Sequence, residues 1–399
     1  MSATTLTPPP MERTLPRLIG EVDQGHIGPT VLAQGGIHGN EPAGVAALER
    51  VLAAIAERKI EVHGRIIACR GNLLALERRR RFVERDLNRQ WLPESLRRLA
   101  AREPENDFAE DREQRELIAL YEKAFAERRG AVVFLDLHTS SAPGAPFSCM
   151  ADTLPNRAVA DALPIPMILG LEECIDGAVM EWFNLRGQVS VAVEGGQHDA
   201  PSTIDNLESA TWLALIAGGS VARKDVDVAF HEQRLERAAA GAPHLVEVVH
   251  RHAIAPADQF AMLPGFVSFQ AVKKGDVLAN DARGPVRARS DGMVLLPLYQ
   301  GLGDDGFFFA RRVPRFWFAL SAVLRRLHLS PLLRILPGVS RDPADPNTLL
   351  VNPKIARFLV VQVFHLFGYR RERARGERLA FSRRWAAKDA ARVAPRHGN

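Results

Sequence analysis

Cysteine is scarce in this sequence of 399 residues: Cys69, Cys149 and Cys174 are the only three, and they are scattered. A disulfide-stapled scaffold and a cysteine-rich zinc site both need more cysteines at closer spacing, so both classes are excluded. The scarcity also predicts a protein of the reducing cytoplasm. The first residues, MSATTLTPPPMERTLPRL, contain no apolar stretch, and we therefore expect no secretory signal there.

Long uninterrupted apolar runs are missing as well. The two most apolar segments, residues 316–336 and 355–367, are broken by Arg, His, Gln or Pro. Neither reaches the roughly 20 apolar residues that a membrane-spanning helix needs. We predict no transmembrane span but two amphipathic helices, which could pack on the body, on a partner subunit or on a membrane surface. Peripheral membrane contact and a homo-oligomer both stay open.

The surplus of positive charge lies at one end of the chain. Residues 370–399 carry ten basic and three acidic residues, a surplus of seven, although the net charge of the whole chain is only +5. The remainder therefore has a net charge of −2, and the high pI is a property of the tail. We expect this basic tail to stay solvated, and we expect no nucleic-acid partner.

The first 220 residues alternate short apolar runs with segments of helical periodicity. Five apolar runs predict strands, namely residues 30–36, 63–70, 130–138, 164–170 and 188–196. Apolar residues at helical spacing predict helices over residues 42–57, 112–128 and 205–217. Strands separated by helices indicate an α/β domain around a mostly parallel or mixed sheet.

The remainder of the chain has different sequence patterns. Residues 244–313 consist of short β-type runs punctuated by glycine, which predicts a small all-β domain, either a barrel or a sandwich. We therefore divide the chain into an α/β domain that carries the candidate chemistry (residues 1–220), a helical connector (221–243), the small β domain (244–313) and a helical extension with a basic tail (314–399).

The sharpest local feature is GGIHGNEPAG, which places His38 and Glu41 directly after a predicted strand. A second histidine, His138 in FLDLHTS, ends another predicted strand. Two histidines and a carboxylate are the ligand set of a catalytic zinc site whose fourth position is left for water, and strand ends at one sheet edge bring distant residues together. The alternative is a chance pairing, with a structural or solvent-facing His138.

Glu194 ends a further apolar strand in VSVAVEGG. A carboxylate there is costly unless it is paired, bound to a metal or catalytic, and the alternative is an exposed loop glutamate. Beside a metal site, Glu194 would be the general base, taking a proton from water and passing it to the leaving amine.

The segment RFVERDLNR, residues 81–89, offers donors for an anionic group. Arg89 suits bidentate binding of a carboxylate, with Asn88 beside it. Arg81 could stabilise a developing oxyanion. The neighbouring arginines of ERRRR read as solvated surface charge.

The motifs HGNE, DLNR, DLHT and VEGG, in this order and spacing, resemble the succinylglutamate desuccinylase/aspartoacylase family, which is related to the zinc carboxypeptidases. The resemblance covers roughly residues 15–312 and implies a zinc-carboxypeptidase-like mixed sheet flanked by helices. It further implies specific roles for matching residues: His38, Glu41 and His138 as ligands of one zinc ion per chain, Glu194 as catalytic acid/base, Arg81 as the carbonyl-polarising arginine, and Asn88 with Arg89 as the substrate-carboxylate pair.

The resulting hypothesis is a zinc-dependent hydrolase that cleaves the amide bond of a small N-acyl amino acid. One alternative is a zinc carboxypeptidase acting on peptide C-termini, and another is a non-enzymatic protein that binds a membrane surface or a partner. A wide cleft would favour the peptidase, whereas a pocket capped by the β domain would favour the deacylase. Arg186 and His198 receive no role, the latter being read as a loop residue.

Overall fold

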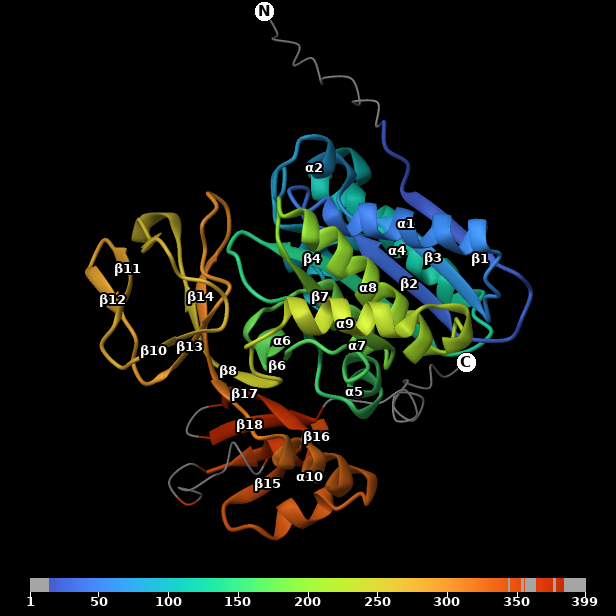
Figure 1. The fold of residues 1–399 in the computed structure, drawn as a ribbon. Helices are drawn as coiled ribbons and strands as arrows, with labels where there is room; N and C mark the ends of the chain where they lie inside the picture. The colour runs from blue at the N-terminus through green and yellow to red at the C-terminus, as the bar shows by residue number, and fades with distance from the viewer. Residues whose placement is uncertain (1–13, 344, 353–354, 356–363, 376–377, 384–399) are drawn as a thin grey trace, which may run out of the picture.

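The computed structural model describes residues 14–343, 345–352, 355, 364–375 and 378–383 (Figure 1). Its largest element is an eleven-stranded mixed sheet with the strand order β1-β3-β2-β4-β7-β5-β6-β8-β14-β13-β10. These strands are β1 (Leu18–Asp23), β2 (Thr30–Gly35), β3 (Arg65–Arg70), β4 (Val132–Ser140), β5 (Phe147–Cys149), β6 (Met167–Leu169), β7 (Val189–Gln197), β8 (Leu245–Ala253), β10 (Gln270–Val272), β13 (Gly292–Leu295) and β14 (Asp305–Arg312).

Helices cover both faces of this sheet where its strands run parallel (Figure 1). They are α1 (Ala43–Arg58), α2 (Leu73–Glu77), α3 (Pro93–Ala100), α4 (Ala109–Ala126), α5 (Leu154–Ala160), α6 (Leu171–Cys174), α7 (Val179–Leu185), α8 (Pro201–Gly218) and α9 (Val228–Ala238). Parallel strands are buried on both sides and therefore read as continuous apolar runs. That property explains why β2, β3, β4 and β7 could be predicted from the sequence.

Alternation along β2 builds two separate cores. Val31 and Ala33 pack with α1 and α8 in one apolar cluster, whereas Leu32 packs with α4 and α7 in the other. Successive side chains of a strand point to opposite faces, so one buried strand serves both cores. The predicted α/β class with a mixed sheet flanked by helices is confirmed.

Helix α1 approaches the end of β2 unusually closely. A Cβ atom added to Gly35 would lie 2.6 Å from the backbone of Gly44, and one added to Gly44 would lie 2.9 Å from Leu137 on β4. Neither glycine could therefore be replaced without moving backbone. The close contact fixes the loop between β2 and α1, which contains His38 and Glu41.

Residues 244–313 form strands, as predicted, but they continue the large sheet. Strand β8 pairs in parallel with β6, and β14 pairs antiparallel with β8. Strands β9 (Ala261–Met262), β11 (Val277–Asp281) and β12 (Gly284–Arg287) make a separate three-stranded sheet. A small core with Leu278, Val294 and Phe307 lies within this region. The division of the chain into four domains stays a prediction.

The expected helical extension is wrong for most of the described residues after Pro314. The described helical residues are α10 (Arg315–Arg326), a short 3-10 helix over Ser330–Ile335, and residues 364–366, which lie within the second predicted helix. Four antiparallel strands then pair in the order β15-β16-β18-β17: β15 (Val339–Asp342), β16 (Asp345–Val351), β17 (Tyr369–Arg375) and β18 (Arg378–Arg383).

The start of the basic tail is therefore folded, since it forms β17 and β18 and buries Phe381 completely beside Leu349. Long-range strand pairing outweighs the local surplus of arginine. Residues 356–363 and 384–399 lie outside the described residues, so most of the second predicted helix and the end of the tail do too.

A buried ion-pair network joins this extension to the body. Asp152 accepts hydrogen bonds from Arg157 at 2.5 and 3.0 Å and from Arg325 of α10 at 2.8 and 3.2 Å. All three side chains are at most 6% exposed.

None of the helices in the described part of the chain combines the length and apolar character needed to cross a bilayer.

Candidate functional site

The predicted site residues meet at the carboxyl ends of β2, β4 and β7. His38 and Glu41 lie in the loop after β2, while His138 lies on β4 and Glu194 on β7. The register pairs His138 directly with Glu194 on the neighbouring strand. Ligands of open α/β sheets bind outside these strand ends, so the topology itself creates the candidate site.

His38, Glu41 and His138 form a compact cluster with metal-ligand chemistry. Their potential ligand atoms all lie within 4.8 Å of one another, and all three residues are buried. Nδ1 of His38 lies 2.8 Å from one carboxylate oxygen of Glu41, and Nδ1 of His138 lies 3.2 Å from the other. Two imidazoles and one carboxylate facing a common point fit a zinc ion with an open fourth position.

Each histidine has a second carboxylate behind it. Nε2 of His138 lies 3.0 Å from Asp136, and Nε2 of His38 lies 3.3 Å from Asp86. Carboxylates that hold the far nitrogen of a metal-binding histidine fix the orientation and tautomer of the ring. The pairing therefore supports the metal interpretation beyond the three ligands themselves.

The charges of this cluster shift one another. Burial raises the pKa of Glu41, but the adjacent His38 and His138 outweigh it, so the net pKa lies well below the usual value. Burial lowers the pKa of His138, but Asp136 and Glu41 outweigh that effect and raise it well above its usual value. The two imidazoles therefore keep the carboxylate of Glu41 ionised.

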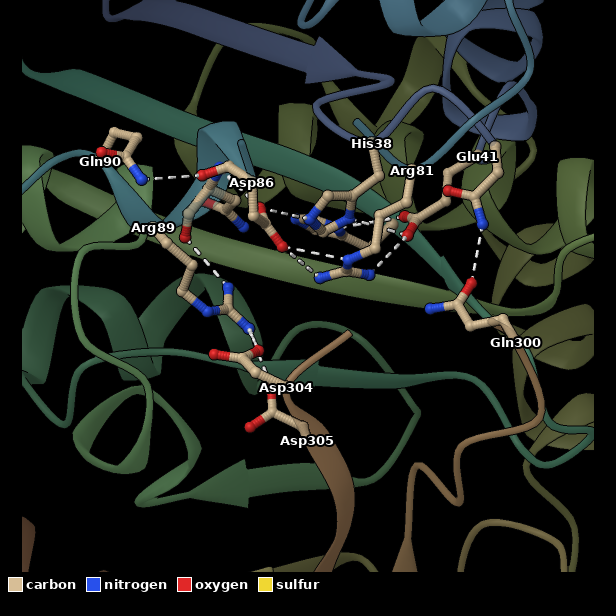
Figure 2. Close-up of polar contacts among 12 residues, drawn as sticks. His38, Glu41, Arg81, Asp86, Arg89, Gln90, Gln300, Asp304 and Asp305 are labelled. Carbon is tan, nitrogen blue, oxygen red and sulfur yellow. Dashed lines mark hydrogen bonds and ion pairs between the residues drawn. The ribbon is translucent and has the colours of Figure 1, made fainter. Parts of the chain in front are cut away.

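Asp86 organises the residues 81–89 around the cluster (Figure 2). It pairs with Arg81 at 2.9 Å, and its other oxygen accepts the backbone N–H of Asn88 at 2.9 Å. That second bond caps the 3-10 turn Leu87–Arg89. The sequence interpretation missed Asp86, although it stands inside the DLNR motif.

A buried carboxylate on α4 also holds the loop of residues 81–89 in place. Glu110 accepts the backbone N–H groups of Val83, Glu84 and Arg85 at 2.7 to 3.1 Å. A loop held by three such bonds presents its side chains in a set geometry. Arg81 consequently faces the cavity, with Nη1 3.9 Å from Glu41.

Glu194 is not an exposed loop residue, which removes that alternative. Its Oε2 atom is buried and has no hydrogen-bond partner among the described residues. Burial is the main reason that its pKa rises to about 7, with Glu41 adding to the effect and His138 opposing it. A carboxyl group with a pKa near neutrality can both accept and return a proton.

Asn88 and Arg89 reach the same cavity, but each is partly engaged. Oδ1 of Asn88 accepts the backbone N–H of Val179 at 2.8 Å. Nη2 of Arg89 lies 2.8 Å from Asp305 at the start of β14, as Figure 2 shows. Its Nε atom is buried and unpaired within the described residues. Nε of Arg89 and the amide nitrogen of Asn88 are donors that could bind a ligand.

These residues line a cavity of about 140 Å³. Its inner wall is largely apolar, with Leu171, Ile175, Met180 and Phe308 among the lining side chains. The loop between β13 and β14 closes one side, contributing Leu298 and Gln300. The β-rich region therefore caps the cavity.

Hydrogen bonds hold the loop between β13 and β14 against the α/β part of the chain. Gln300 accepts a hydrogen bond from Asn40 at 2.8 Å and lies 3.2 Å from His198. His198 in turn contacts the Thr139 hydroxyl at 2.6 Å. His198 is thus a loop residue, as predicted, and it contacts Asn40, Thr139 and Gln300 from three other segments.

Arg186 stacks on Trp182 and is not among the cavity-lining residues.

Comparison with known proteins agrees with this geometry. The family model described as the succinylglutamate desuccinylase/aspartoacylase catalytic domain matches residues 27–197, which include all the predicted site residues. Residues 27–197 of this chain are thus similar to the catalytic domain of the succinylglutamate desuccinylase/aspartoacylase family.

Sequence similarity to individual family members is confined to short stretches. A succinylglutamate desuccinylase from Pseudomonas putida is 42% identical over 59 residues, which are 15% of this chain and 18% of that protein. One from Pseudomonas aeruginosa is 31% identical over 113 residues, or 28% of this chain and 32% of that protein. The chain thus matches less than a third of the length of these curated relatives.

Solved structures extend the likeness to most of the fold. A succinylglutamate desuccinylase/aspartoacylase from Rhodobacter sphaeroides has a TM-score of 0.53 at 20% identity and covers 73% of this chain and 87% of its own. An ectoine utilization protein from Ruegeria pomeroyi has a TM-score of 0.51 at 21% identity with the same coverage. At such identity the likeness shows the shared fold.

Proposed function

We propose that this protein is a zinc-dependent hydrolase that cleaves the amide bond of an N-acyl amino acid into a carboxylate and an amine. The observation that carries the proposal is the cluster of His38, Glu41 and His138 with Glu194 opposite His138, all at one end of a capped cavity. The match of residues 27–197 to the model of the succinylglutamate desuccinylase/aspartoacylase catalytic domain supports the same reaction class.

His38, Glu41 and His138 would hold the zinc ion, with Asp86 and Asp136 orienting the two imidazoles. When bound, zinc supplies a Lewis acid that polarises the amide carbonyl and lowers the pKa of water toward about 7. The apolar inner wall of the cavity excludes bulk water, which strengthens every charge interaction inside.

Glu194 would serve as the proton carrier of the reaction. Its unpaired Oε2 can accept a proton from the attacking water and then deliver that proton to the nitrogen of the leaving amine. Its pKa of about 7 suits both halves of the cycle, because neither protonation state is strongly favoured near neutrality.

Arg81 and Arg89 would bind different oxygen atoms of the substrate, Arg81 the carbonyl oxygen and Arg89 the carboxylate. Arg81 faces the metal cluster and can stabilise negative charge that develops on the carbonyl oxygen. Nε of Arg89 and the amide of Asn88 can hold the substrate carboxylate, which fixes the scissile bond relative to the metal cluster. Positioning of this kind accelerates reaction by removing rotational freedom.

The capped cavity favours a deacylase over the alternative carboxypeptidase. The loop that contains Gln300 closes one side of the cavity, and a cavity of about 140 Å³ suits a small substrate. A peptide substrate would require this loop to move away from Asn40 and His198.

A hydrolysis screen tests the proposal. Zinc-loaded protein is incubated with a set of N-acyl amino acids, and release of free amine is measured for the wild type, His138→Ala and His63→Ala. His63 is a matched control, because its side chain is 44% exposed. We expect turnover of at least one substrate by the wild type and His63→Ala, and none by His138→Ala. Equal turnover by all three proteins would contradict the proposal.

A further inference from the structure

A second cavity, of about 330 Å³, lies in the β-rich region between the large sheet and the hairpin of β11 and β12. Among the described residues, it shares no lining side chain with the candidate catalytic cavity. Strand β14 separates the two cavities, because Phe308 lines the catalytic one whereas Phe307 and Phe309 line the second. Successive side chains of a strand point to opposite faces, so the second cavity is a separate space with its own chemistry.

The wall that the large sheet contributes carries four rings. These are His250 and His252 on β8 and Phe307 and Phe309 on β14. The strand register places His252 opposite Phe307 and His250 opposite Phe309. The rings of His252 and Phe307 are stacked, with centroids 4.9 Å apart and planes inclined by 10°. This ring wall suits the aromatic or apolar part of an organic ligand.

The wall that the hairpin contributes carries three arginines. Arg283 lies in the turn between β11 and β12, Arg287 ends β12, and Arg289 follows two residues later. Arg283 is paired with Asp281 at 3.1 Å, and Asp281 is the one carboxylate among the described lining residues. Arg287 donates to the backbone carbonyl of Gly275 at 2.8 Å and has no carboxylate partner in the described part of the chain. Arg289 makes no hydrogen bond or ion pair with the described residues.

The charge of these arginines reaches the ring wall. Burial lowers the pKa of His250, and Arg289 and His252 lower it further. Burial also lowers the pKa of His252; Asp281 opposes that shift, whereas Arg283 and Arg289 add to it. Two guanidinium groups without a carboxylate partner therefore give the cavity a positive potential, which attracts an anion.

We propose that this cavity is a second ligand site, which binds a small phosphate monoester with its phosphate on Arg287 and Arg289 and its organic part on the ring wall. A phosphate monoester carries a charge of about −1.5 to −2 near neutral pH, which matches two arginines, whereas a single carboxylate matches one. The planar guanidinium group binds phosphate oxygens through paired N–H donors.

The size of the cavity supports an organic ligand over a bare ion. Its volume of about 330 Å³ lies within the range of roughly 300–1,000 Å³ that small-molecule sites occupy. An inorganic phosphate ion on the arginines would leave the ring wall uncovered. The proposed ligand therefore needs both a phosphate group and a ring or apolar part.

Calorimetric titration of the full-length protein with AMP tests the proposal, because AMP joins a phosphate monoester to a flat ring. Adenosine lacks the phosphate, and ribose 5-phosphate lacks the ring. We expect AMP to bind at least about tenfold more tightly than adenosine and several-fold more tightly than ribose 5-phosphate. Absence of saturable AMP binding, or equal affinity for AMP and adenosine, would overturn the proposal. Equal affinity for AMP and ribose 5-phosphate would overturn the role of the ring wall.

Variants of the two free arginines assign the binding to this cavity. Arg287→Gln and Arg289→Gln should each weaken AMP binding by at least about tenfold, and because both side chains are exposed we expect an unchanged circular dichroism spectrum. Arg98→Gln is the matched control, since it removes the same charge from a side chain that is 66% exposed and lines neither cavity. It should leave AMP affinity unchanged.

AMP binding that is unaffected in both cavity variants, or that is weakened equally in Arg98→Gln, would overturn the assignment. The measurement requires neither zinc nor turnover, so its outcome is independent of the proposed hydrolase function.

Discussion

Replacing Asp152 by Asn should destabilise the whole protein far more than a typical change of one charge. Asp152 lies after β5 in the body and receives hydrogen bonds from Arg157 and from Arg325 of α10. Arg157 also donates to the carbonyl of Phe318 on α10, and Arg325 donates to that of His365. Asp152 is therefore a negative charge at which these two guanidinium groups meet across the junction with the extension.

The magnitude follows from burial. The side chain of Asp152 is 1% exposed, and those of both arginines are 6% exposed, so water cannot replace the lost carboxylate. Removing one partner of a buried ion pair leaves an uncompensated charge and costs about 3–5 kcal/mol. The exposed pair Glu94–Arg98 provides the control, since its side chains are 70% and 66% exposed. Glu94→Gln should cost about 0.3–0.5 kcal/mol.

Urea denaturation monitored by tryptophan fluorescence and by circular dichroism measures both variants against the wild type. We expect a large shift of the unfolding midpoint for Asp152→Asn and almost none for Glu94→Gln. A loss of less than about 1 kcal/mol in Asp152→Asn would show that the extension contributes little to the stability of the body, and the reasoning from burial would be refuted.

Three further predictions concern the candidate site. His38→Ala and His138→Ala should each lose most of the zinc that the wild type holds at about one ion per chain after dialysis; full retention of zinc, measured by elemental analysis, would contradict the ligand assignment. Arg89→Lys keeps the charge but loses the planar fork, so KM should rise for substrates with a free carboxylate and change little for their amides; an equal effect on acid and amide would argue against this role. The raised pKa of Glu194, about 7, means that its base form is lost as pH falls below 7; kcat/KM should decline there, and a flat profile between about pH 5 and 8 would exclude Glu194 as the base.

The part of the fold that the sequence predicted well is the part whose signals are local. Residues 30–36, 130–138 and 188–196 were expected as strands, and β2, β4 and β7 occupy nearly the same positions. Because parallel strands are buried on both faces, each forms a continuous apolar run that needs no tertiary information to be recognised. The very short β5 and β6 give weaker signals, and β5 was missed.

The extension was misjudged because its signals are not local. The arginines of residues 370–375 suggested a solvated tail, whereas β17 and β18 pair as a hairpin and β18 pairs with β16. The partners Leu349 and Phe381 meet through this register, which no local pattern encodes. Tertiary pairing routinely overrides strand propensity in this way.

The candidate site shows the same division. Three of the motifs supplied His38, Glu41, His138 and Glu194, and the structure places these residues close together. Asp136 could have been found, since it lies two residues before His138 and thus on the same face of β4. Asp305 could not, because it lies 216 residues from Arg89, and only the folded β-rich region brings it there.

The most direct test of the central claim is the turnover of Glu194→Gln measured together with its zinc content. The substitution keeps the shape of the side chain and removes the proton acceptor, while leaving the three candidate ligands untouched. We predict that the variant retains about one zinc per chain and loses at least about 100-fold in kcat on the best N-acyl amino acid substrate. A variant that keeps both its zinc and wild-type turnover would contradict the account, because some other group would then be the base.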